Sequence, residues 1–178
     1  MISFALVYTC LVIITLIFCA TVFGLAVKNV VNDVNHINDV NDISKTNITN
    51  FTIPAIPANQ PSLSNLVSIA AIMQAMWLCI PILVVYLITV GLISVSDGTA
   101  RMIFKVLGAL ILIPLNIWLL VDAVIALSYV QKGDNLLMNN TIFGMTIMAA
   151  IFCLITSVMF LGGIVYGLVR GSNKKLAF

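Results

Sequence analysis

The amino-acid sequence predicts an all-α integral membrane protein. We expect a four-helix (tetraspan) bundle with both termini on the cytoplasmic side and one longer external loop between the first two spans. Of the 178 residues, 62% are hydrophobic and only 8% are charged, whereas soluble domains contain about 25% charged residues. Four predominantly apolar runs also exceed the roughly 20 residues that a helix needs to cross a bilayer. These runs cover residues 3–27, 66–95, 103–130 and 141–169.

Helices are the better choice of secondary structure for these four runs. Each run is much longer than a transmembrane β-strand and lacks the alternation of apolar and polar residues that such strands show. A helix also satisfies its own backbone polar groups in lipid. Because the polar remainder of the chain is too short for a separate soluble core, we expect a single membrane domain over residues 1–178.

Residues 3–27 are predicted to be an uncleaved span rather than a signal peptide. The run has no basic residue before it and is longer than the roughly 7–15 apolar residues of a signal peptide. All four cysteines lie inside predicted spans, at Cys10, Cys19, Cys79 and Cys153. A thiol in an apolar span is expected to act as a small hydrophobic side chain. No Cys-x-x-Cys pair occurs, which argues against a membrane thiol oxidoreductase.

The external loop is predicted over residues 28–65, and its first part is an internal repeat. Asn recurs at every third position from Asn29 to Asn50, with one interruption at Ser44. This pattern fits either an Asn-lined interaction surface or a low-complexity segment tolerated in an external loop, and we favour the second interpretation.

The same loop contains candidate sites of modification and a candidate helical extension. Asn47 and Asn50 each begin an Asn-x-Thr sequon, so both are candidate glycosylation sites if the chain enters a eukaryotic secretory membrane. No Pro or Gly occurs between Gly24 and Pro54. The first span is therefore expected to continue outward as an amphipathic helix, with apolar residues at the i, i+4, i+7 positions Val30, Val34 and Ile37.

Basic residues near the span ends predict the orientation of the chain. Five of them flank the second connection or follow the fourth span: Arg101, Lys105, Arg170, Lys174 and Lys175. Three lie on the other side: Lys28, Lys45 and Lys132. This excess places both termini, including the basic C-terminal tail over residues 170–178, on the cytoplasmic side.

Asp122 is the only ionisable residue well inside a span, where its charge would cost at least about 2.5 kcal/mol at the bilayer centre. Asp122 and Gln74 each lie eight residues from the outer end of their span. Antiparallel neighbours would hold them at one depth, which predicts a hydrogen bond between them. Asn116 lies deeper and is rotated by about 120° around the helix from Asp122, so we expect it to serve another contact. Asp122 is then either a polar contact between helices, which we favour, or a proton or cation site.

Glycines in the fourth span predict close helix packing. Gly163, Gly167 and Gly171 recur at intervals of four residues and form a flat stripe that another helix backbone can approach. The partner is either another span of this chain or another subunit.

The chain contains none of the residue patterns that would indicate an enzyme. It has a single histidine, no glutamate and no nucleotide-binding or metalloprotease motif. We expect no catalytic residue, cofactor or metal site. A net charge of +2 is also too small to favour nucleic acid as a partner.

Two functions remain as hypotheses. The first is a non-enzymatic multi-pass membrane protein that serves as a structural or accessory subunit, for example in an organellar complex or in the membrane of a large virus. The alternative is a small oligomeric transporter or channel that uses Asp122 as an ion or proton site. The expected partners are the lipid bilayer and other membrane subunits or further copies of the chain. No targeting motif identifies the membrane as secretory, organellar or viral.

Overall fold

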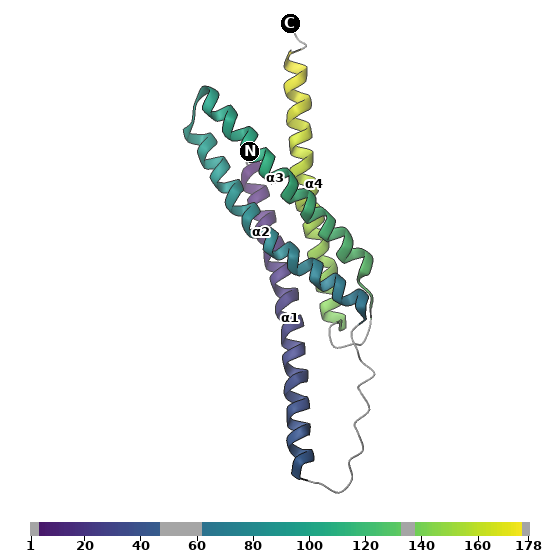
Figure 1. Cartoon of the computed structure of the whole chain (residues 1–178). Coiled ribbons are helices and arrows are strands. Elements are labelled where there is room, and N and C mark those ends of the chain that lie inside the picture. Colours follow the sequence, from purple (N-terminus) through teal and green to yellow (C-terminus); the bar gives the residue numbers. More distant parts are fainter. Residues whose placement is uncertain (1–3, 47–61, 133–137, 176–178) are drawn as a thin grey trace.

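The computed structural model describes residues 4–46, 62–132 and 138–175. Four α-helices occupy almost all of this part of the chain (Figure 1): α1 (Phe4–Thr46), α2 (Leu63–Val95), α3 (Gly98–Tyr129) and α4 (Asn140–Lys175). Each helix contains a segment long and apolar enough to cross a membrane: Phe4–Asn32, Leu63–Val95, Gly98–Tyr129 and Asn140–Gly167. The prediction of an all-helical fold with four candidate membrane spans is therefore confirmed for the described residues, and four such helices indicate an integral membrane protein.

The first helix is longer than its predicted span. It has 43 residues, which at about 1.5 Å per residue make a helix about 65 Å long, roughly twice the thickness of a bilayer core. Residues 28–46 were placed in the loop between the first two spans, but they belong to α1. The expected helical continuation of the first span is thus confirmed, since no Gly or Pro interrupts the helix between Gly24 and Thr46. Figure 1 shows this part of α1 extending beyond the other helices. The sequon residues Asn47 and Asn50 lie outside the described residues.

The four helices form a ring in which each packs against its neighbours. α1 contacts α2 and α4, and α3 also contacts α2 and α4. Figure 1 shows α2 and α3 as an antiparallel hairpin that crosses α1 and α4 at an angle. α1 and α3 consequently face each other across the ring. The fourth helix continues to Lys175, so it takes in much of the segment expected to be a basic tail.

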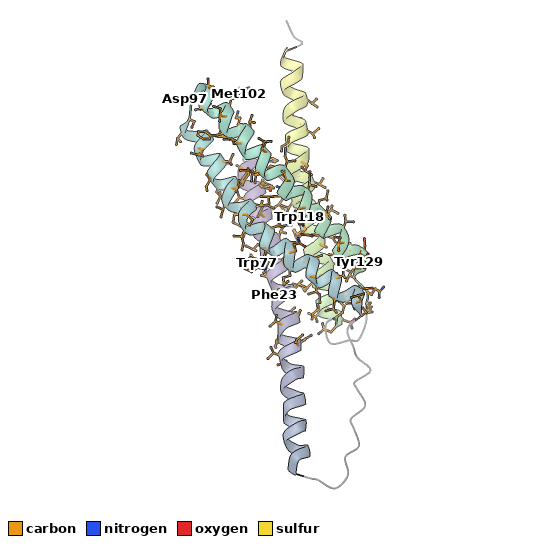
Figure 2. All side chains as sticks on the ribbon, viewed as in Figure 1. Phe23, Trp77, Asp97, Met102, Trp118 and Tyr129 are labelled. Carbon is orange, nitrogen blue, oxygen red and sulfur yellow. The ribbon has the colours of Figure 1, made fainter. Side chains whose placement is uncertain are left out.

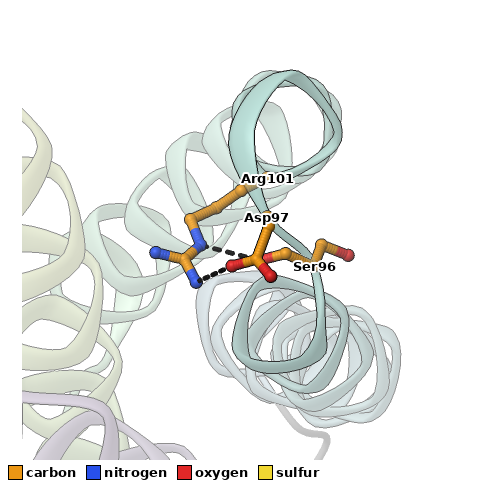
Figure 3. Close-up of polar contacts among 3 residues, drawn as sticks. All are labelled: Ser96, Asp97 and Arg101. Atoms are coloured by element: carbon orange, nitrogen blue, oxygen red, sulfur yellow. Dashed lines mark hydrogen bonds and ion pairs between the residues drawn. The ribbon is translucent and has the colours of Figure 1, made fainter.

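Ser96 and Asp97 connect α2 to α3, and Gly98 is the first residue of α3. Gly98 has a φ of +54°, a left-handed conformation that glycine adopts without the steric cost of a side chain. Arg101 donates from Nε to the Ser96 carbonyl (2.9 Å) and from Nη2 to Asp97 Oδ1 (3.1 Å), as Figure 3 shows. This ion pair is exposed, and such pairs contribute at most about 1 kcal/mol.

Small side chains fill much of the interior, whereas many large apolar side chains cover the outside. α2 buries Ala71, Ala75 and Cys79 toward the bundle. Trp77 and Trp118 remain 64% and 53% exposed on the outer surface (Figure 2). An apolar exterior is what a bilayer requires, because hydrocarbon solvates these side chains and water does not.

Candidate functional site

The buried polar side chains of the bundle are the candidate functional site. In the described residues they are Thr15, Asn65, Ser68, Asn116, Asp122, Thr146, Thr156 and Ser157. Such groups are costly in an apolar interior unless they find hydrogen-bond partners. Six of the eight have a partner, and the two exceptions are Asp122 and Thr146.

Asn116 connects α3 to α1 across the ring. Its Oδ1 accepts a hydrogen bond from the Tyr8 hydroxyl (2.9 Å), and its Nδ2 donates to the Leu112 carbonyl (2.9 Å). The Tyr8 ring also packs on Tyr86 of α2 and Phe160 of α4, with centroids 4.6 and 5.1 Å away. Tyr8 therefore contacts all three other helices. Sequence reasoning missed Tyr8, although a tyrosine inside a span is an apolar body with a hydroxyl that needs a partner.

Two side chains near the start of α2 bind the end of α3. Ser68 Oγ donates to the Ala126 carbonyl (2.9 Å), and Asn65 Oδ1 accepts from the Gln131 backbone nitrogen (2.9 Å). The first bond joins two adjacent antiparallel helices, and the second joins α2 to the residues just past the end of α3. They hold the open end of the α2–α3 hairpin together.

A polar seam joins α1 to α4. Thr15 Oγ1 donates to the Leu11 carbonyl (2.7 Å) and lies 2.9 Å from Thr156 Oγ1, so Thr156 is the donor in the second bond. One turn further along, Cys19 Sγ and Cys153 Sγ lie 3.8 Å apart. None of these residues had been assigned to a site from the sequence.

Asp122 does not form the predicted hydrogen bond with Gln74. The Ser68–Ala126 contact shows the antiparallel alignment on which the prediction was based. However, Gln74 is exposed while Asp122 is only 1% exposed. Gln74 precedes the buried Ala75 by one residue, a rotation of about 100° around the helix that carries its amide away from the interior. The amide of Gln74 and the carboxylate of Asp122 therefore lie on different faces.

Asp122 is left without a partner on one carboxylate oxygen. Oδ2 is buried and makes no hydrogen bond, and the same holds for Thr146 Oγ1 on α4. An unpartnered buried oxygen carries its full desolvation cost. Asp122 is therefore the buried polar group that packing alone explains least.

The three stripe glycines of α4 have different surroundings. A Cβ atom at Gly163 would lie 2.7 Å from Phe4 Cζ, so this glycine faces α1. A Cβ atom at Gly167 would meet no atom within 4 Å, so this glycine faces open space. The surroundings of Gly171 lie outside what the structure describes. Part of the predicted stripe thus packs within the chain, and part is open.

No group of three or more His, Cys, Asp or Glu side chains in the described residues is placed to hold a metal ion. Comparison of the chain with protein-family models, curated proteins and solved structures found no match.

Proposed function

We propose that the protein is a non-enzymatic structural or accessory subunit that packs with other membrane helices in a larger assembly. The observation that supports this proposal is the surface of α4 beyond Gly163. Here Gly167 faces open space, and Val165, Tyr166 and Val169 are exposed. Figure 1 shows this end of α4 rising past the start of α1. A small residue among exposed apolar side chains allows a second membrane helix to approach closely.

The proposal includes an orientation and a class of membrane. Both termini lie on the cytoplasmic side, in keeping with the five basic residues near that side and the three on the other. The assembly belongs to an organelle, to the secretory pathway or to the internal membrane of a large virus. Its partners are lipid and other subunits or further copies of this chain.

A leucine at Gly167 is expected to weaken the assembly without unfolding the bundle. Its side chain fills the space that a partner helix would occupy, so association should lose on the order of 1 kcal/mol, roughly fivefold in Kd. The unfolding temperature of the monomer should not fall, because no atom of the chain lies near this site. The measurement is the mass distribution of the protein cross-linked in its native membrane.

Gly162→Leu is the matched control, since Gly162 also has open space around it but lies on a different face of α4. Its assembly should match that of the wild type. If Gly167→Leu assembled as well as the wild type and Gly162→Leu, this face of α4 would contact only lipid. The proposed packing surface would then be wrong.

A second candidate function is an oligomeric transporter or channel, and the environment of Asp122 favours it. A buried carboxylate with one unpartnered oxygen has the capacity to hold a proton or a cation inside a membrane. Flux through proteoliposomes at two pH values separates the two functions. For a structural subunit we expect no flux above that of empty liposomes. For a transporter, flux depends on pH and is lost in Asp122→Asn, which keeps the shape of the side chain and the assembly.

A further inference from the structure

Two cysteine thiols from opposite ends of the sequence meet in the interior of the bundle. Cys19 on α1 and Cys153 on α4 are 134 residues apart in sequence, yet their sulfurs lie 3.8 Å from each other. Both residues are 0% exposed. In the described part of the chain this is the one contact between two thiols, because Cys79 is buried without such a contact and Cys10 is exposed.

The backbones of α1 and α4 are close here because the facing side chains are short. Thr15 and Thr156 share a hydrogen bond one turn away, and Gly163 receives the Phe4 ring further along. A disulfide needs an S–S distance of about 2.05 Å, so the two sulfurs must approach by less than about 2 Å. Rotation of the two side chains within a close helix pair supplies movement of this size.

An aromatic pair lies beside the two sulfurs. Phe18 and Phe152 directly precede Cys19 and Cys153, and their rings stack with centroids 4.8 Å apart at an angle of 15°. Both phenylalanines are partly exposed, whereas both thiols are fully buried. The helices are antiparallel, so the residue before each cysteine turns toward the same side of the seam. The stacked rings therefore stand between the sulfurs and the lipid-facing surface.

We propose that Cys19 and Cys153 are a site of oxidative modification, at which a lipid-soluble hydroperoxide converts the two thiols into a disulfide that links α1 to α4. The burial of both thiols in a membrane span selects the class of oxidant. Because both sulfurs are 0% exposed, an oxidant reaches them only when the Phe18–Phe152 pair moves aside. This pair is partly exposed on the apolar surface, where hydroperoxides dissolved in the hydrocarbon are present and water-borne oxidants are not.

The reaction balances in two steps. One thiol sulfur attacks the terminal peroxide oxygen, the O–O bond breaks, and the thiol proton leaves with the alkoxide as an alcohol, so that a sulfenic acid forms. The second sulfur then attacks the sulfenic sulfur, and the hydroxyl leaves with the second thiol proton as water. The two thiols are oxidised by two electrons, and the hydroperoxide is reduced to the alcohol and water.

The disulfide joins the first helix of the bundle to the last. It closes a loop that contains α2 and α3, and a covalent link of this kind restricts the unfolded chain. The oxidised protein should therefore unfold at a higher temperature than the reduced protein.

The test uses the full-length protein in lipid nanodiscs, treated with cumene hydroperoxide or with the same concentration of hydrogen peroxide. After denaturation, the remaining thiols are labelled with maleimide and counted by mass spectrometry. Cys10 is replaced by serine in this test, because it is the one exposed thiol and would react with either oxidant. Cumene hydroperoxide should then reduce the labelled thiols from three to one, with Cys19 and Cys153 in one linked peptide. Hydrogen peroxide should react several-fold more slowly.

Cys153→Ser should abolish the disulfide, and Cys79→Ser is the matched control. Cys79 is equally buried, so its serine variant should still form the disulfide, and serine at either position is close in size to cysteine. Phe152→Ala should speed the reaction with cumene hydroperoxide several-fold, because it opens the seam beside the sulfurs.

Several results would overturn the proposal. They are three labelled thiols after cumene hydroperoxide in the Cys10→Ser protein, a disulfide that contains Cys79, or loss of two thiols when Cys153→Ser is added. Equal rates with the two oxidants would contradict the membrane-borne route, and an unchanged rate in Phe152→Ala would contradict the role of the rings.

Discussion

Replacing Gly108 with leucine is expected to separate α2 from α3 and to lower the stability of the bundle by about 2 to 3 kcal/mol. A Cβ atom at Gly108 would overlap Thr89 Cγ2 and would lie 2.8 Å from Thr89 Oγ1 and 3.2 Å from Thr89 Cβ. Rotation of the threonine moves its Cγ2 and Oγ1 but not its Cβ, which is fixed to the backbone of α2. The two helices must therefore move apart, and the contact along the hairpin is weakened.

The measurement is unfolding in detergent, with Gly91→Leu as the matched control. Gly91 lies on α2 near the same end of the hairpin, and a Cβ atom there would meet no atom within 4 Å. Its leucine variant should stay within about 0.5 kcal/mol of the wild type, as expected for a substitution in open space. Thr89→Ala should recover part of the loss in the double variant, because the two positions are in direct contact. Wild-type stability of Gly108→Leu would show that the hairpin does not pack as described.

Asn116→Leu is expected to cost about 1 to 3 kcal/mol, because it leaves the buried Tyr8 hydroxyl without an acceptor. Tyr8 and Asn116 are both 0% exposed, so neither group can turn to solvent. Tyr8→Phe should be costly for the same reason, since it leaves Asn116 Oδ1 unpaired. The double variant should be more stable than the sum of the two losses predicts, because it removes both polar partners together.

Gln74→Leu is the control for this cycle. It is also an amide-to-leucine change inside a span, but Gln74 is exposed, and the predicted bond to Asp122 is absent. Its stability should be equal to or above that of the wild type. A loss in Gln74→Leu as large as that in Asn116→Leu would mean that the amide of Gln74 is engaged in the bundle after all.

The apolar runs of the sequence located the helices better than they located the contacts between helices. The ends of the candidate spans in α2 and α3 were predicted within a few residues, because an apolar run long enough to cross a bilayer begins and ends close to the ends of its helix. The continuation of α1 beyond its apolar run, which ends at Val27, was predicted from the absence of Gly and Pro. The helix does continue to Thr46, because helix propagation depends on the absence of these residues rather than on hydrophobicity.

The helix faces were predicted less well than the helix lengths. The Gly163 position does face another helix of the chain, but Gly167, one turn later, does not. A four-residue repeat indicates which residues share a face, but it does not indicate how far along that face the neighbouring helix extends. Phe4 of α1 lies beside Gly163, whereas a Cβ atom at Gly167 meets nothing within 4 Å.

The sequence by itself determined that the chain has four helices long and apolar enough to cross a membrane, and where their apolar parts lie, because these properties follow from local composition along the chain. Only the tertiary structure decided which side chains meet. The Tyr8–Asn116 bond and the Cys19–Cys153 contact join residues more than a hundred positions apart, and the Gly108–Thr89 contact joins neighbouring helices. Each depends on the rotation of a helix about its axis and on the angle at which helices cross. These variables are set by the packing of all four helices together, and a rotation of about 100°, one residue, was enough to place Gln74 outside.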